Sequence, residues 1–158
     1  MSLLSQTRNM IKLGELLSND LGYDYDGPKE SGPNGKKKEF LTTGRAFLSA
    51  LAKDLGFKER DIHTNKAGIA VSGEVYLYGM WESSGIMMVL EQDIMGERHI
   101  CYRTIKHMKD SKGGHNHFIT LRELKAANYG DIIARVLLLR DGLLPKEDEG
   151  YGYDRRVA

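Results

Sequence analysis

The spacing of the hydrophobic residues changes along this chain, and that change limits its possible folds more than any other feature. Between residues 3 and 21, leucine, isoleucine and methionine recur at steps of three, four or seven, which predicts an amphipathic helix. A second stretch of this kind starts after Thr42 or Thr43 and ends at Gly56. From residue 62 the period becomes two, which is typical of strands. We therefore expect helices combined with a sheet.

Three extended segments are predicted in the middle of the chain. The first begins near residue 62 and loses its alternation at Gly79. Turns at Glu82–Gly85 and Asp93–Glu97 separate it from strands at 86–92 and 98–106. Sequential strands joined by short turns are expected to pair as an antiparallel meander.

The last third of the chain is predicted to become helical again. A short apolar segment, Phe118–Ile119, precedes a capping box from Thr120 to Glu123, and Asp131 is expected to cap a last helix. The order of these segments predicts an α+β fold. In it, an antiparallel meander of three to four strands packs against N-terminal and C-terminal helices.

The 158 residues, of which 41% are hydrophobic, are expected to form one domain over residues 1–142. Glycine, proline and lysine dominate residues 23–39, which we expect to be a mobile loop. Residues 143–158 are expected to be a disordered, charged tail.

The total charge excludes two classes of protein. With 23 Lys and Arg against 22 Asp and Glu, the net charge of +1 is that of neither a histone-like cation nor an acidic DNA mimic. The single cysteine argues against a disulfide-built secreted domain, and no apolar run is long enough to cross a bilayer. We therefore expect a soluble, cytoplasmic protein without membrane contact.

The charges are nevertheless distributed unevenly. Residues 66–97 carry one lysine and five acids, whereas residues 98–125 carry seven Lys and Arg and two acids. A basic strand–loop–helix segment of this kind can bind the phosphates of DNA or RNA, although it can equally be a solvated surface. We therefore expect a small, non-enzymatic binding or regulatory module that needs no cofactor. Its candidate nucleic-acid-binding residues are Arg98, Arg103, Lys106, Lys109 and Lys112, with Lys36, Lys37 and Lys38 as a second basic group.

An alternative function rests on aromatic side chains. Tyr76 and Tyr78 share one face of a predicted strand, and a bulge at Gly79 would bring Trp81 beside them. The three rings would then form a surface for another protein, for a second copy of the chain, or for bases. In this case the protein is an inhibitor or adaptor.

A third alternative is a metal-dependent nuclease or hydrolase. Carboxylates at strand ends can bind magnesium, and the candidates here are Glu74, Glu91 and Asp93. Histidine and cysteine are the ligands that zinc prefers, and the candidates are His99, Cys101, His115 and His117. Neither set has a familiar ligand spacing, so we assign no metal site and no catalytic residue.

Overall fold

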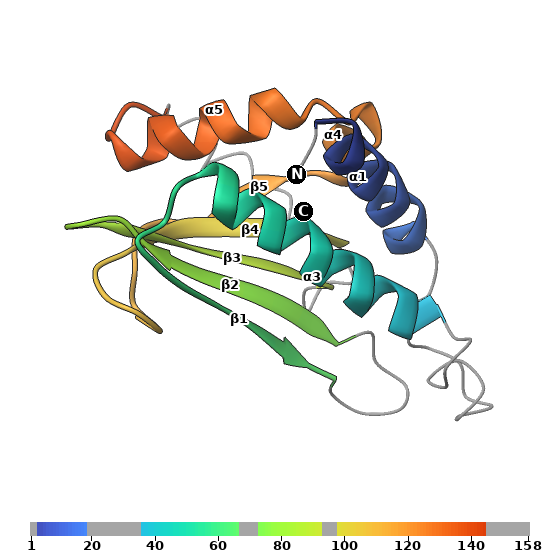
Figure 1. Ribbon diagram of the computed structural model, residues 1–158, viewed down its shortest axis with the longest axis horizontal. Coiled ribbons are helices and arrows are strands. Elements are labelled where there is room, and N and C mark those ends of the chain that lie inside the picture. The colour runs from blue at the N-terminus through green and yellow to red at the C-terminus, as the bar shows by residue number, and fades with distance from the viewer. Residues whose placement is uncertain (1–2, 19–35, 67–72, 93–97, 145–158) are drawn as a thin grey trace, which may run out of the picture.

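A five-stranded antiparallel sheet forms the centre of the fold, and the helices of the described residues lie on one of its faces (Figure 1). The computed structural model describes residues 3–18, 36–66, 73–92 and 98–144. The predicted α+β fold is confirmed, with one strand more than expected. In space and in the chain the strands run β1 (Glu59–Asn65), β2 (Glu74–Met80), β3 (Gly85–Gln92), β4 (Arg98–Ile105) and β5 (His117–Ile119).

The predicted first strand, which begins near residue 62 and ends at Gly79, is divided in the structure into β1 and β2. Strand β1 pairs with β2 along its whole length, from Glu59 opposite Met80 to Asn65 opposite Glu74. Ile62 is its only aliphatic residue, so its sequence lacks the alternation that would identify it. Pairing with β2 makes it extended, and its polar composition suits a strand at the edge of a sheet. Residues 67–72, where we placed part of the first strand, lie outside the described residues.

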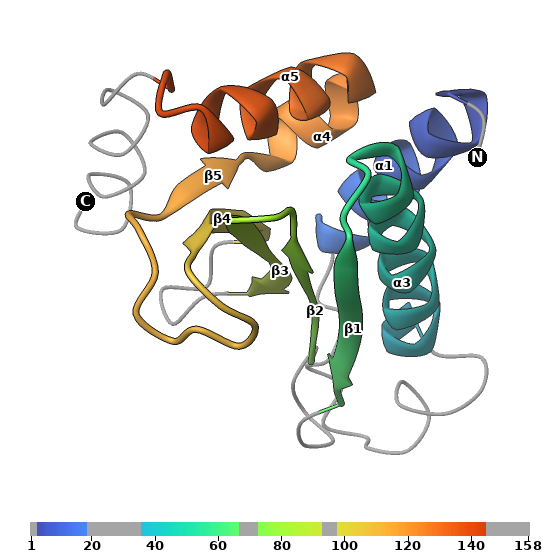
Figure 2. The ribbon, with the colours of Figure 1, turned by 60° about the vertical axis from the view of Figure 1, so that its left-hand side comes forward.

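The helices form a layer over the sheet. Helix α3 (Lys36–Asp54) packs on β1 and β2, and α5 (Tyr129–Arg140) packs on β3 and β4. Helix α1 (Leu3–Leu17) contacts α3, α4 (Leu121–Ala126) and α5, and Figure 2 shows it beside α3. No helix among the described residues is long and apolar enough to span a membrane.

The main core lies between the sheet and this helical layer. The ring of Phe57 packs against Gly79 of β2, where a Cβ atom would lie 2.2 Å from it, so only glycine fits there. The side chains from the sheet that face the helices and are almost completely buried are Val75, Leu77, Ile86, Met88, Leu90, Ile100, Tyr102 and Ile119.

Helix α3 begins earlier than predicted. Lys36, Lys37 and Lys38 form its first turn, and Thr43, which we expected near its start, is buried inside it. The expected loop at 23–39 is therefore wrong for its last four residues, and the rest of it lies outside the described residues.

The end of α3 is as expected. Gly56 has a positive φ of 66° and donates its N–H to the carbonyl of Lys53, while Phe57 donates to Ala52. This pair of hydrogen bonds is a Schellman motif, which ends a helix at a glycine.

The capping box of α4 is confirmed, but the predicted cap of α5 is wrong. Thr120 accepts from the N–H of Glu123, whose carboxylate accepts in turn from the N–H of Thr120. Helix α5 is capped by Asn128, whose side chain accepts from the N–H of Asp131, so that Tyr129 already lies in the helix.

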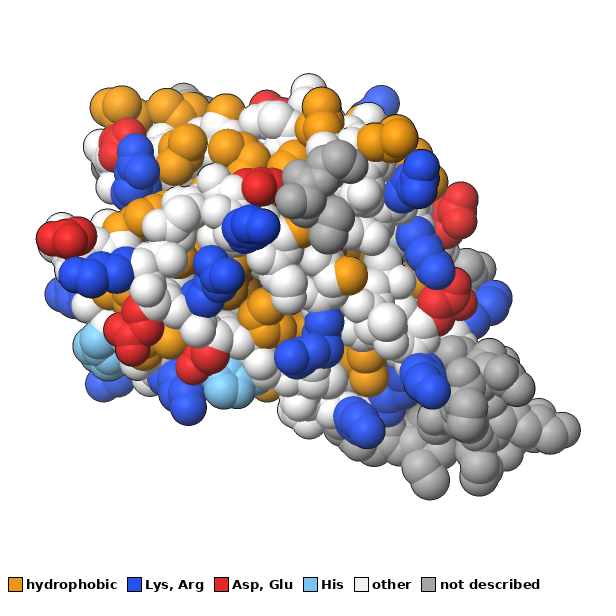
Figure 3. Space-filling view, in the orientation of Figure 1, with side chains coloured by type: hydrophobic (Ala, Val, Ile, Leu, Met, Phe, Trp, Pro, Cys, Tyr) orange, Lys and Arg blue, Asp and Glu red, His pale blue; other side chains and the backbone are white. Residues whose placement is uncertain are grey.

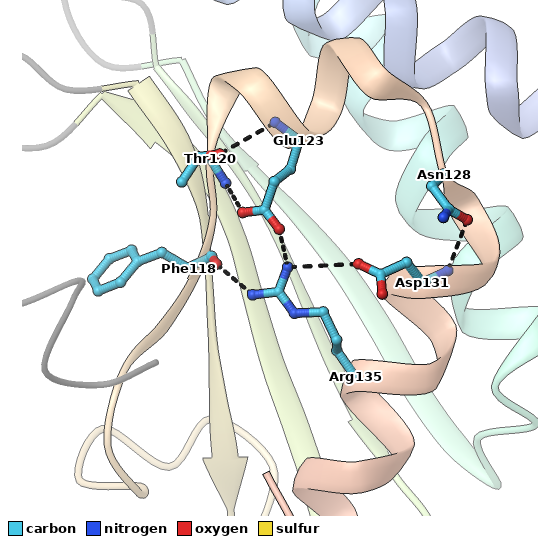
Figure 4. A network of polar contacts seen from close by, with 6 residues as sticks. All are labelled: Phe118, Thr120, Glu123, Asn128, Asp131 and Arg135. Carbon is cyan, nitrogen blue, oxygen red and sulfur yellow. Dashed lines mark hydrogen bonds and ion pairs between the residues drawn. The ribbon is translucent and has the colours of Figure 1, made fainter. Parts of the chain in front are cut away.

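An arginine from the helical layer caps each edge of the sheet. Arg45 of α3 donates to the carbonyl of Ile62 on β1 (3.4 Å), and Arg135 of α5 donates to the carbonyl of Phe118 on β5 (2.8 Å). Arg135 also contacts the carboxylate of Glu123 at 2.5 Å (Figure 4). These contacts occupy carbonyls that an added strand would otherwise use.

Candidate nucleic-acid interface

The loop between β4 and β5 is built around the carboxylate of Asp110. One of its oxygens accepts from the backbone N–H of Lys106 (3.0 Å), and the other accepts from that of Lys112 (2.8 Å). The pKa of Asp110 is lowered chiefly because these two donors stabilise the charged carboxylate. The buried Asp110 side chain thus fixes the path of a loop that has no helix or strand of its own.

Arg103 holds the same loop from the sheet. Its Nη2 donates to the carbonyl of Asp110 (2.8 Å), and the N–H of Gly114 donates to the carbonyl of Thr104 (3.0 Å). A Cβ atom at Gly113 would lie 2.1 Å from Nη1 of Arg103, so the close approach of the loop requires glycine at this position. Arg103 therefore supports the loop from within, although we had counted it among the residues that contact a partner.

The loop exposes three of the predicted lysines. Lys106, Lys109 and Lys112 are exposed, as is His107 between them. The loop lies on the side of the sheet away from the helices (Figures 1 and 2), where the helical layer does not cover it. It can therefore present three ammonium groups to one anionic partner.

The second basic group lies elsewhere. Lys36 and Lys38 are exposed at the start of α3, at the opposite end of the molecule from the β4–β5 loop (Figures 1 and 2). Lys37 is buried, and burial, together with the nearby charge of Lys66, lowers its pKa. On the face seen in Figure 3, basic side chains are interspersed with acidic ones. The two basic groups therefore do not form one surface, and the side chain of Arg98 lies outside the described residues.

The two predicted tyrosines lie on the sheet face opposite the helices. The ring centres of Tyr76 and Tyr78 are 6.3 Å apart, and His63 of β1 lies 6.4 and 5.9 Å from them. Both tyrosine side chains are half-buried, so part of each ring is accessible to a partner.

Trp81 does not join these rings. Strands β2 and β3 pair without a bulge from Val75 to Met80, so alternation places Trp81 on the helical side. There its ring centre is 4.6 Å from that of Phe57, and its Nε1 donates to the carbonyl of Leu55 (2.8 Å). Trp81 therefore packs against the helical layer, and the three-ring surface that we considered does not form.

The candidate metal ligands do not converge in the described part of the chain. Cys101 packs with Val89 and Phe118 on the face away from the helices, whereas His117 stacks on the core residue Tyr102 with ring centres 5.6 Å apart. Across the described residues, no group of three His, Cys, Asp or Glu could hold a metal.

The candidate catalytic carboxylates do not form a cluster among the described residues either. Glu74 accepts from the hydroxyl of Tyr76 (2.6 Å) and from the amide of Asn65 (3.1 Å). The side chain of Glu91 and all of Asp93 lie outside the described residues.

Sequence reasoning missed two residues that shape these surfaces. Asp110 was counted only as a charge, although an aspartate that bonds the backbone two residues on is a common turn element. His63 was overlooked because residues 62–79 were predicted as one strand, whereas β1 pairs with β2 and places His63 opposite Tyr76.

Comparison with known proteins gives no relative for this chain: no family model, no curated protein and no solved structure matches it.

Proposed function

We propose that this chain is a small binding module that contacts nucleic acid through the β4–β5 loop. The observation that carries the proposal is the exposure of Lys106, Lys109 and Lys112 on a loop held in place by Asp110 and Arg103. Lysines on a fixed loop lose less conformational freedom on binding than lysines on a flexible one. Such contacts with phosphates supply affinity without reading sequence.

A further feature fits this proposal. Asp110 lies beneath the loop with its carboxylate bonded to backbone N–H groups, so it is turned away from a partner at the surface. We further propose a regulatory role and a cytoplasmic location. The location is supported by the single, buried Cys101, since a reducing compartment leaves thiols free.

The test is the affinity of the purified chain for labelled DNA and RNA, in single-stranded and duplex form, measured by fluorescence anisotropy over a series of salt concentrations. Three lysine–phosphate contacts predict that log K falls against log salt with a slope of about −2 to −3. Reversing two charges, in Lys109→Glu/Lys112→Glu, should abolish binding at low salt.

Two matched variants complete the test, and each changes the total charge by the same amount. Lys53→Glu/Lys58→Glu alters exposed lysines outside both basic groups and should leave the affinity within about threefold. Lys36→Glu/Lys38→Glu tests the start of α3. If this pair abolishes binding while the loop pair does not, the interface lies on α3. Absence of binding to every probe at low salt would refute the proposal.

A further inference from the structure

The sheet face opposite the helices carries a second surface, which does not depend on the β4–β5 loop. We call it the tyrosine face and define it as His63, Tyr76 and Tyr78 with the carboxylates of Asp61 and Glu74. The three rings lie edge to face or tilted, with centres 5.9–6.4 Å apart. This spacing is that of favourable aromatic pairs, so the rings support one another as a fixed surface.

The polar atoms of this face are arranged around the rings. Oδ1 of Asp61 lies 3.0 Å from Nε2 of His63, and the hydroxyl of Tyr76 donates to Glu74 at 2.6 Å. This hydrogen bond stabilises the protonated phenol, and it therefore raises the pKa of Tyr76 to about 12. A phenol that donates to a carboxylate also has a more electron-rich ring, and such a ring attracts cations more strongly.

The charges around the rings determine which kind of partner this face can bind. Two carboxylates lie beside the rings, and a third, the exposed Glu59, is on the same face by strand alternation. Among the described residues whose side chains lie on this face by strand alternation, the cation nearest to Tyr78 in the sheet register is Arg103, two strands away. Its guanidinium is bonded to the β4–β5 loop. Phosphates would be repelled here, whereas ammonium or guanidinium groups would be attracted.

We propose that the tyrosine face binds an extended, cationic segment of a partner protein, whose lysine or arginine side chains lie over the rings of Tyr76 and Tyr78. Aromatic rings flanked by carboxylates provide both parts of cation recognition, the negative ring face and the full counter-charge. The site differs from the nucleic-acid interface in position and in charge, so neither proposal requires the other.

The experiment measures binding of a labelled peptide of alternating lysine and serine, beside a counterpart with glutamate in place of lysine. The lysine peptide should bind, more tightly at low salt, and the glutamate peptide should not. Tyr76→Leu/Tyr78→Leu should weaken binding about tenfold, and Tyr76→Phe/Tyr78→Phe, which keeps the rings, should stay within about threefold. Circular dichroism of each variant checks that the chain is folded.

A matched pair of carboxylate variants tests the charge contribution while both tyrosine rings are kept. Glu74→Gln should weaken binding of the lysine peptide, whereas Glu82→Gln, an equal change in the exposed β2–β3 turn, should not. Equal binding of both peptides, or no effect of the leucine variant, would overturn the proposal. Two other results would also overturn it. In one, a single-stranded oligonucleotide binds in a way that depends on the two rings, and the lysine peptide does not. In the other, self-association of the chain depends on the rings, and peptide binding does not.

Discussion

Asp110 and Arg103 give the β4–β5 loop a defined shape where no helix or strand does so. The carboxylate of Asp110 accepts from the N–H groups of Lys106 and Lys112, and Arg103 donates to the carbonyl of Asp110. Both residues were counted in the sequence as parts of a charged surface, but in the structure they support the loop. The lysines between them remain exposed, and it is these that we expect to contact a partner.

Replacing Asp110 by alanine should loosen this loop without unfolding the protein. Amide hydrogen exchange of residues 106–114 should become faster, while the unfolding midpoint changes little, because the loop lies outside the main core. Ser111→Ala, a change at an exposed neighbour, should leave exchange unaltered. If the alanine variant at Asp110 protects these amides as well as the wild type does, the carboxylate does not hold the loop.

The same carboxylate makes the order of the loop depend on pH. Because the pKa of Asp110 is lower in the folded protein, its stabilising effect is complete above the unfolded value of about 3.9 and is lost as pH falls through the folded value. Protection factors of the loop amides should therefore be constant at neutral pH and should fall in strong acid.

At the scale of elements, the two arginines that cap the sheet edges differ in burial. The side chain of Arg135 is 13% exposed, contacts Glu123 and Phe118, and lies with its guanidinium carbon 5.8 Å from the ring centre of Tyr102. Arg45 makes its hydrogen bonds to Ile62 and Thr64 at an exposed position. Burial makes the loss of a partner more costly, since water does not replace it.

Arg135→Met should therefore lower the free energy of unfolding by about 2 kcal/mol, since Glu123 is partly exposed and can be rehydrated. Arg45→Met, the matched change at the other edge, should cost less than about 1 kcal/mol. Urea denaturation monitored by circular dichroism measures both. Equal losses would show that burial does not distinguish the two edges.

The elements that were predicted correctly are those whose own side chains form the core. The 3.6-residue period identifies α1, and the turns and apolar strands identify the β2–β3–β4 meander. The start of β1 and its division from β2 escaped prediction because the pairing of these two strands decides them. The first turn of α3 escaped because packing of the whole helix holds it in place. The tyrosine face depends on such long-range contacts even more: β1 supplies His63, and the sheet register decides that Trp81 faces away from Tyr78.

At the scale of the whole molecule, buried polar groups link the helices that are far apart in the chain. Gln6 of α1 is fully buried and donates to the carbonyl of Phe47 in α3 (3.2 Å). Tyr129 of α5 donates its hydroxyl to Asp54 at the end of α3 (2.6 Å). No local sequence pattern reports these contacts, because their partners are 41 and 75 residues apart. They connect three helices through directional bonds, in addition to apolar packing.

This arrangement makes the stability of the molecule sensitive to alkaline pH. Burial, and then the hydrogen bond to Asp54, raise the pKa of Tyr129 because both favour the neutral phenol. In the unfolded chain a tyrosine ionises near pH 10, so its stabilising effect is complete below about pH 10 and is lost as pH rises through the folded value.

Tyr129→Phe should remove this dependence. At neutral pH the variant loses the hydrogen bond to the exposed Asp54, which should cost about 1 kcal/mol. Above about pH 10 its free energy of unfolding should fall less steeply than that of the wild type, so the difference between the two proteins narrows. Urea denaturation at a series of pH values measures this. Asp54→Asn keeps the phenol but removes the carboxylate, so the fall of its free energy of unfolding above about pH 10 should be intermediate between those of the wild type and Tyr129→Phe. Parallel curves for the wild type and Tyr129→Phe would show that another group governs alkaline unfolding.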